Sequence, residues 1–393
     1  MKTKVVLVGA RGYATAYLEP LLKHAESERY EFVGIVARDI TKSPCFQEVQ
    51  SRGIPVYKTL EAFFNENTAD LVIIATPPHL HAAQSLLAIA NGANVLCEKP
   101  IAPLYTDALA MKAASESSGR FIGIGFQWAF SQAVQSLKKD ILSEKFGKPK
   151  LFKSFVSWPR GWDYYEGTWK GNVRDPDGTW ILDSVVGNAT AHYLQVLYFL
   201  LGKEMDGCDF PQKVSSELYR ANRIDNFDTC LLDIQTCGGA NIFYVASHAT
   251  DINENPRFQL EFENAVITYN MINRDNRIVA IFSDGNVNDY GDPGVDIDNR
   301  LWQAIDSVST GEPLACEVKT ALAHTFTVNK LYEHGKIVNF PAELVTRDVT
   351  KRQTSVIGLY DLLSRAYQEE RMLADMDVAW AEGTTFVVEK GEL

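Results

Sequence analysis

Near its N-terminus the chain reads Lys4-Val5-Val6-Leu7-Val8-Gly9-Ala10-Arg11-Gly12-Tyr13-Ala14, an apolar run that leads into a glycine-containing turn. An uninterrupted run of this kind is typical of a strand buried on both faces of a sheet. The next residues predict an amphipathic helix to about residue 24, with Leu18, Leu21 and Leu22 on one face. A strand, a glycine turn and a helix are the setting of a dinucleotide site, because a helix N-terminus attracts the pyrophosphate.

The turn matches only part of the GxGxxG/A pattern of dinucleotide-binding folds. Gly9 and Ala14 fill its first and third positions, whereas Arg11 replaces the second glycine. That glycine normally lets the backbone approach the phosphates, and here we expect the Arg11 guanidinium to lie near them instead. Taken alone, the motif is equally compatible with an ordinary strand-to-helix turn. The expected cofactor residues of the turn are Gly9, Ala10, Arg11, Gly12 and Tyr13.

The end of the second predicted strand, Phe32-Val33-Gly34-Ile35-Val36, bears on the choice of cofactor. An acidic residue there binds the ribose 2′-hydroxyl of NAD, whereas a nearby Arg accommodates the 2′-phosphate of NADP. Ala37 holds the usual acidic position and Arg38 follows, so the sequence favours NADP. Asp39 comes one residue later and keeps NAD open, and the alternative to both is a solvated Arg-Asp turn.

Strands and helices then alternate to residue 126, which predicts a parallel sheet. The strand at 70–75 ends in Thr76-Pro77-Pro78-His79-Leu80-His81, and the loop backbone is expected to flank the cofactor. The two histidines have no carboxylate or thiolate partners in the loop, which argues against a metal site. We therefore assign Thr76, Pro77 and His81 to the cofactor side and predict no metal.

The segment Cys97-Glu98-Lys99-Pro100 closes a short buried strand. Ligands of open α/β sheets bind outside the carboxyl ends of the strands, which is where Lys99 would lie. Glu98 can tune the charge of Lys99, and Pro100 restricts Lys99 to extended conformations. Without the upstream context, an ordinary solvated lysine would be the better interpretation.

Four motifs together resemble the glucose–fructose oxidoreductase/inositol dehydrogenase/MocA (Gfo/Idh/MocA) family of NAD(P)-dependent oxidoreductases. They are Gly9 to Ala14, the Ala75-Thr76-Pro77-Pro78-x-x-His81 turn, Gly92 through Glu98-Lys99-Pro100, and Gly125-Phe126-Gln127. The resemblance is strong over residues 1–130, moderate over 180–202 and weak elsewhere. It implies a Rossmann domain with Glu98 and Lys99 at the cofactor, and a second domain whose sheet covers the nicotinamide.

The resemblance implies that Lys99 contacts the substrate hydroxyl and the nicotinamide ribose and helps to move the proton. Simple chemistry agrees, because a cation beside a hydroxyl under oxidation stabilises the developing alkoxide charge. The family pattern Asp-x-x-x-His places a general acid/base at His192. Asn188 replaces the family Asp, and Asp183 is the nearby carboxylate that would compensate. The spacing of Asn188 and His192 predicts one helix face, and the alternative for His192 is a structural core histidine.

Before this segment lies Ser157 to Gly171, which has more aromatic residues than a loop without a function and is too polar and rich in glycine for a core strand. Rings that cover CH faces, with polar groups between them, suit a sugar or polyol. The alternative is a loop buried in a subunit contact. The expected substrate residues are Asn188, Asp183, Trp162, Tyr164, Tyr165, Trp169 and Gln127.

From residue 213 onward short alternating runs predict strands, with helices at 299–308, 320–334 and 355–375. The expected fold class is α/β. A doubly wound parallel Rossmann sheet occupies 1–126, and an α+β substrate and oligomerisation domain with a large, mostly antiparallel sheet occupies 127–393. The last part, 341–393, reads as a helical extension beyond the family core.

Composition restricts the possible partners. The 393 residues carry a net charge of −12, which disfavours nucleic acid and anionic membranes. Six scattered cysteines without a CxxC pair argue against a disulfide framework and fit a reducing compartment. The N-terminus shows no signal peptide and no apolar run reaches a membrane span. We expect a cytoplasmic homodimer or homotetramer with a small-molecule sugar or polyol substrate.

The function expected from the sequence is NAD(P)-dependent hydride transfer to or from a secondary hydroxyl or ketone of a sugar, cyclitol or polyol. Two alternatives stay open. One is a glycosidase of the same fold that holds NAD and oxidises its substrate transiently. The other is a non-catalytic cofactor or sugar sensor, which the retention of Lys99 and His192 disfavours and Asn188 slightly favours.

Overall fold

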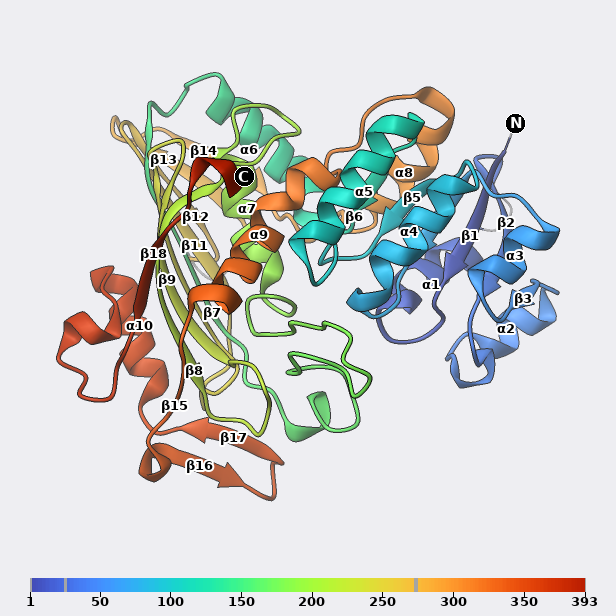
Figure 1. The fold of residues 1–393 in the computed structure, drawn as a ribbon. Coiled ribbons are helices and arrows are strands. Elements are labelled where there is room, and N and C mark those ends of the chain that lie inside the picture. Colours follow the sequence, from blue (N-terminus) through green and yellow to red (C-terminus); the bar gives the residue numbers. More distant parts are fainter. Residues whose placement is uncertain (1, 25–26, 272–274, 393) are drawn as a thin grey trace. The chain divides into compact units, whose positions relative to one another are not determined.

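The structure is a computed structural model that describes residues 2–24, 27–271 and 275–392 (Figure 1). The chain forms two compact units, one made of residues 1–130 and 296–322 and the other of residues 131–295 and 323–393. The first unit is therefore discontinuous in sequence. The sequence predicts a single boundary at 126/127, with residues 296–322 in the second domain. In the structure these residues belong to the first unit.

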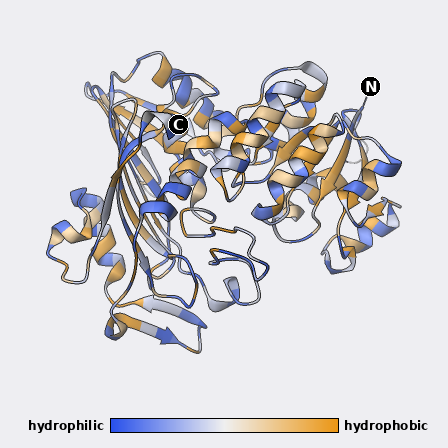
Figure 2. Cartoon of the chain, viewed as in Figure 1, coloured by the Kyte–Doolittle hydropathy of each residue, from blue (hydrophilic) through white to orange (hydrophobic). Residues whose placement is uncertain are grey.

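The sheet of the first unit has six parallel strands in the order β3-β2-β1-β4-β5-β6. This is the expected Rossmann order, with its reversal between β1 and β4. Every residue of β4 and β5 is buried, which explains the wholly apolar sequence of β4 and the apolar run that follows Asn94 in β5 (Figure 2). The strands are β1 (Thr3–Val8), β2 (Tyr30–Val36), β3 (Val56–Tyr57), β4 (Leu71–Ile74), β5 (Asn94–Cys97) and β6 (Ile122–Ile124).

Helices cover both faces of this sheet. Neighbouring helices α3, α4 and α5 pack together over one face, whereas α8 packs against β1, β4 and β5 and meets α1. Leu301, Ala304 and Ile305 of α8 are buried, which explains why this late segment belongs to the first unit. The helices are α1 (Thr15–Lys23), α2 (Phe46–Ser51), α3 (Leu60–Glu66), α4 (His81–Ala90), α5 (Tyr105–Ser118) and α8 (Asn299–Thr310).

The second unit is built on a ten-stranded, mostly antiparallel sheet, as expected. Its order is β14-β13-β12-β11-β7-β10-β9-β8-β15, with β18 also paired to β8. The pairs β10–β7 and β15–β8 are parallel. The strands are β7 (Pro149–Ser157), β8 (Pro211–Arg220), β9 (Thr229–Thr236), β10 (Asn241–Ser247), β11 (Glu254–Phe262), β12 (Ala265–Tyr269), β13 (Ile278–Phe282), β14 (Val287–Gly291), β15 (Ile337–Asn339) and β18 (Thr384–Val387).

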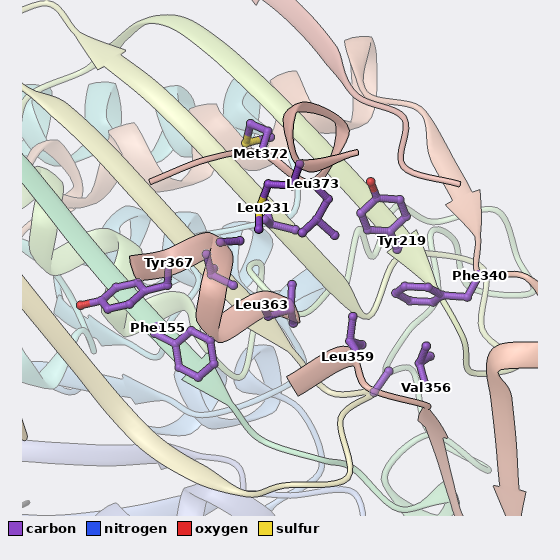
Figure 3. Packing of buried hydrophobic residues seen from close by; sticks show 14 of the residues in the cluster. Phe155, Tyr219, Leu231, Phe340, Val356, Leu359, Leu363, Tyr367, Met372 and Leu373 are labelled. Atoms are coloured by element: carbon purple, nitrogen blue, oxygen red, sulfur yellow. The ribbon is translucent and has the colours of Figure 1, made fainter. Parts of the chain in front are cut away.

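Both faces of this sheet are packed near β7 and β10. Helix α10 (Leu359–Glu369) lies on one face and α7 (Ala191–Leu201) on the other (Figure 1). Under α10, Phe155, Leu231 and Val245 form a core with Leu363 and Tyr367 (Figure 3). Two further helices are α6 (Gln132–Leu142) and α9 (Val318–His334), and the start of α9 belongs to the first unit.

The C-terminal segment is not the helical extension that the sequence predicts. The interval 355–375, expected as one helix, holds the end of β17 (Gln353–Val356), α10, and a 3-10 turn at Leu373–Met376. Strand β17 forms a hairpin with β16 (Val345–Asp348). Helix α10 ends at Glu369, and the left-handed backbone of the next residue, Glu370 (φ 56°), turns the chain away. The segment is thus a mixed α/β addition that covers one sheet face.

We predict that the packing of α10 on the sheet contributes to the free energy of unfolding. Replacing Leu363, which is 0% exposed, with Ala should lower the free energy of unfolding by about 2–5 kcal/mol, because a buried cavity results. Urea denaturation followed by circular dichroism measures this change. The control Val349→Ala, at a 74% exposed position, should change it by less than about 0.5 kcal/mol. Equal effects would show that α10 is not part of the core.

Candidate functional site

The glycine turn after β1 has a geometry that suits a dinucleotide. Gly9 has φ 121°, and a Cβ there would lie 2.5 Å from the carbonyl oxygen of Ala75, so only glycine fits so close to the β4 loop. Gly12 has φ 59° and faces open space. Arg11 is exposed in an extended conformation just before the 3-10 turn Gly12–Ala14, which leads into α1. The open backbone and the helix N-terminus fit a pyrophosphate.

After the end of β2, the carboxylate of Asp39 is bound by nearby residues of its own loop. Its carboxylate accepts hydrogen bonds from the Thr41 N–H (3.1 Å) and hydroxyl (2.5 Å) and lies 3.7 Å from the Lys42 ammonium. The Thr41 hydroxyl bond lowers the pKa of Asp39. Asp39 thus caps a local 3-10 turn. Lys58 donates to the carbonyl of Arg38 (2.9 Å), which adds a second cation beside that loop.

The loop after β4 is held by its own side chains. The Thr76 hydroxyl donates to Gln84 (2.7 Å), and Pro77 precedes the 3-10 turn Pro78–Leu80. His81 is fully buried at the start of α4, with its ring nitrogens 2.8 Å from the carbonyl oxygens of Thr76 and Pro100. Burial lowers the pKa of this imidazole. His81 thus joins the loops that follow β4 and β5, and its expected place on the cofactor side stays a prediction.

Lys99 lies half-buried directly after β5, at the carboxyl end of the parallel sheet. Its N–H donates to Oε2 of Glu98 (3.0 Å), and its peptide bond to Pro100 is cis. Oε1 of Glu98 accepts the hydroxyl of Tyr17 (2.5 Å). Glu98 is thus buried and fixed on both sides, and it fixes the backbone of Lys99 in turn.

Arg300 of α8 completes this network. Its Nε donates to the Tyr17 hydroxyl (2.8 Å) and lies 3.6 Å from the Glu98 carboxylate, with only 1% of its side chain exposed. Its guanidinium also reaches Gln127 (3.5 Å), which accepts the hydroxyl of Tyr13 (2.7 Å). Gln127 thus bonds the glycine turn, and its expected contact with the substrate stays a prediction.

Sequence reasoning did not find Tyr17 or Arg300. One signal was present, because Arg300 precedes Ala304 by four residues and thus lies on the apolar stripe of α8. A charged residue on such a stripe is almost never fully buried unless it is paired. Its partner Glu98 is about two hundred positions away in the sequence, and no local pattern connects the two.

In the second unit, His192 and Asn188 do not share a helix face as expected. Helix α7 begins at Ala191, so His192 is in its first turn, whereas Asn188 lies in the preceding turn. The Asn188 amide donates to the hydroxyl of Tyr164 (3.4 Å). The His192 ring lies edge-on to Tyr193 (6.5 Å). Asn188 is thus directed to the aromatic loop within the second unit.

Asp183 is buried next to the same aromatic loop. Its Oδ2 accepts the N–H of Gly171 (2.5 Å). Tyr164 and Tyr165 pack edge-to-face (5.0 Å), and the His248 ring lies edge-on to Tyr164 (5.9 Å). The structure therefore brings together four of the expected substrate residues: Asp183, Asn188, Tyr164 and Tyr165.

The other two aromatic residues expected at the substrate, Trp162 and Trp169, behave differently. The Trp162 indole donates to the Thr354 hydroxyl of β17 (3.0 Å), so it anchors the loop to the hairpin. Trp169 is half-buried in the loop. Arg352 strengthens the same anchor through Asp163 (2.8 Å) and Glu166 (2.5 Å). The C-terminal addition thus holds the aromatic loop in place.

Within residues 2–24, 27–271 and 275–392, no three His, Cys, Asp or Glu side chains form a group able to hold a metal ion. In the same ranges no helix combines the length and the apolar character of a membrane span.

Comparison with known proteins supports the interpretation of the first unit. Residues 3–126 match the model of the oxidoreductase family with an NAD-binding Rossmann fold. A dehydrogenase of 1-carboxy-3-chloro-3,4-dihydroxycyclohexa-1,5-diene from Comamonas testosteroni is 25% identical over 48% of this chain and 45% of its own. A 2,7-anhydro-N-acetylneuraminate hydratase from Mediterraneibacter gnavus is 28% identical over 51% and 50%. The chain thus spans about half the length of these curated relatives.

Solved structures extend the similarity of fold to most of the chain. An oxidoreductase from Agrobacterium radiobacter, solved with NAD+, L-tartaric acid and magnesium, covers 92% of this chain and 100% of its own. Its TM-score is 0.68 at 18% sequence identity. At that identity the likeness shows a shared fold of both units.

We predict that Arg300 stabilises the first unit through the buried Glu98. Arg300→Met should lower the free energy of unfolding by about 3–5 kcal/mol, because a buried carboxylate loses its compensating charge. The exposed Arg29, which pairs with Asp306, offers a matched control, and Arg29→Met should cost less than about 1 kcal/mol. Adding Glu98→Gln to Arg300→Met should restore part of the loss in urea denaturation. Equal losses for both arginines would contradict this assignment.

Proposed function

We propose that this chain, which belongs to the Gfo/Idh/MocA oxidoreductase family through residues 3–126, transfers hydride to or from a secondary hydroxyl or ketone of a sugar, cyclitol or related polyol. The observation that carries the proposal is the position of Lys99, fixed by Glu98 at the carboxyl end of a Rossmann sheet. Partial relatives named as dehydrogenases of a cyclic diol and of inositol support the substrate class.

In this proposal Lys99 is the catalytic cation. Its ammonium stabilises negative charge on the reacting oxygen, which lowers the barrier to removal of the hydroxyl proton. Glu98 acts as a positioning residue, because it binds the Lys99 N–H rather than the substrate. Nicotinamide supplies or accepts the hydride when the cofactor is bound.

We propose that His192 exchanges the proton with solvent at the same substrate. Its place in the first turn of α7 leaves the ring at a helix end. Asn188 and Asp183 would orient substrate hydroxyls, since both lie beside Tyr164 and Tyr165 in the second unit. An amide in place of the family carboxylate still donates and accepts hydrogen bonds.

We propose that NADP is the preferred cofactor. Asp39 already accepts two hydrogen bonds from Thr41 and pairs with Lys42, so binding a ribose hydroxyl would require it to give up local partners. Ala37 offers no carboxylate, whereas Arg38 is exposed at the loop. An Arg at this point suits a 2′-phosphate.

Replacing Arg38 with Ala should weaken NADP binding about 10–100-fold, as expected when hydrogen bonds to a charged group are lost. Binding of NAD should change less than about threefold. Fluorescence titration with both cofactors measures the two affinities. Arg52→Ala, which removes an exposed arginine paired with Glu48, should leave both unchanged. A preference of the wild type for NAD would overturn the choice of NADP but not the reaction.

Two other functions are separated by cofactor turnover. A glycosidase that oxidises its substrate only transiently would bind the cofactor and cause no net cofactor reduction, so the absorbance at 340 nm would not rise. A sensor would bind sugar or cofactor and convert neither. The buried support of Lys99 through Glu98, Tyr17 and Arg300 favours catalysis, because a binding module needs no such positioning.

Lys99→Ala should reduce kcat by about 10²–10⁴-fold, because the variant loses the group that assists proton transfer. The dissociation constant of the cofactor should change less than about threefold. Steady-state rates with a polyol panel, together with cofactor titration, measure both quantities. Lys112→Ala, at an exposed helix pair with Glu116, is the matched control. Unchanged turnover in the Lys99 variant would refute its catalytic role.

A further inference from the structure

The aromatic loop of the second unit presents two cations on one ring. The Lys170 ammonium lies 4.0 Å from the Tyr164 ring centroid, and the Arg160 guanidinium lies 5.0 Å from the same centroid. The Tyr165 and His248 rings lie edge-on to Tyr164, Asp183 interacts with the charge of Lys170, and Arg160 interacts with His248. We call these six residues the Tyr164 cluster.

The positive charges of the cluster lack ion-pair partners. In the ranges that the structure describes, neither Arg160 nor Lys170 has a carboxylate within 4.0 Å, and the Nε of Arg160 is buried without a hydrogen-bond partner. The acids of the same loop, Asp163 and Glu166, are already paired with Arg352. Arg160 also lowers the pKa of Lys170 by charge repulsion, and a bound anion would offset that repulsion.

The acidic and neutral members of the cluster do not remove the excess of positive charge. Asp183 is the nearby carboxylate, and its single negative charge acts on Lys170 while one of its oxygens accepts the Gly171 N–H. Burial lowers the pKa of Lys170, although Asp183 opposes this shift. Cation–π contacts alone stabilise each side chain by only about 0.5–2 kcal/mol, which does not explain two of them on one tyrosine.

His248 adds a hydrogen-bond acceptor of known direction. Its Nδ1 lies 2.8 Å from the Trp158 carbonyl, which can only accept, so Nδ1 carries the proton and Nε2 the lone pair. Burial and the nearby Arg160 lower the pKa of His248 to about 3, so the ring is neutral at physiological pH. The cluster therefore combines donors for an anion with an acceptor for a hydroxyl.

We propose that the Tyr164 cluster binds the anionic group of a sugar substrate, with Arg160 and Lys170 as its ligands and the Tyr164 ring as their support. The shared chemistry is a carboxylate or a phosphate ester, both of which accept the paired N–H groups of a guanidinium. The cluster is thus a specificity site, and this assignment rests on the proposed oxidoreductase function.

The test compares sugars that differ in charge, with full-length protein and saturating cofactor. The probes are D-glucuronate and D-glucose 6-phosphate against D-glucose and myo-inositol. Arg160→Gln and Lys170→Met should lower kcat/KM for the charged probe about 10–100-fold, as expected for lost hydrogen bonds to a charged group. The value for neutral probes should change less than about threefold. Arg174→Gln is the matched control, because Arg174 also stacks on an aromatic ring, that of Trp180.

A binding measurement separates this proposal from the catalytic one. Calorimetric titration of each probe at constant ionic strength needs no turnover. Binding of an anionic probe to the wild type that is lost in both variants supports the site, even if Lys99→Ala leaves turnover unchanged. The probe with the lower dissociation constant shows whether the site prefers a carboxylate or a phosphate. Equal binding of charged and neutral probes, or anion binding that survives in both variants, overturns the site and leaves the proposed reaction standing.

Discussion

The buried carboxylate of Glu98 is the contact on which the cofactor side of the first unit depends. Its two oxygens connect β5 to α1 through Tyr17 and to α8 through Arg300, while also holding the Lys99 backbone. A charge in this position is tolerated only when its partners are all present. The arrangement therefore couples the backbone position of Lys99 to two helices that are distant in sequence, α1 and α8.

The second unit fixes its loop by a different means. A sheet with a packed core on each face supports an aromatic loop that the hairpin β16–β17 fastens through Trp162 and Arg352. The loop is long and polar, and such segments hold one conformation only where side chains pin them. The acidic residues of the loop are paired with Arg352, so in our proposal its basic residues, Arg160 and Lys170, bind the ligand.

Much of the first unit could be predicted from sequence, because buried parallel strands have apolar sequences and their alternation with helices indicates a parallel sheet. The strands β8–β13 were found by the same means. What escaped prediction depends on tertiary contacts. Arg300 gains its buried partners only when α8 packs on the sheet. Asn188 lies outside α7, which begins at Ala191. The Trp162 side chain points to a hairpin that no pattern in its own loop announces.

The discontinuity of the first unit has a consequence for its biosynthesis. The ribosome makes a protein from its N-terminus, so Tyr17 and Glu98 emerge long before Arg300. Every strand from β7 to β14 is translated in that interval. At about 5–20 residues per second, the nascent Rossmann half waits on the order of ten seconds or more for the guanidinium that completes it. The first unit of this protein therefore starts to form before the second unit and is completed only after most of the second unit has been made.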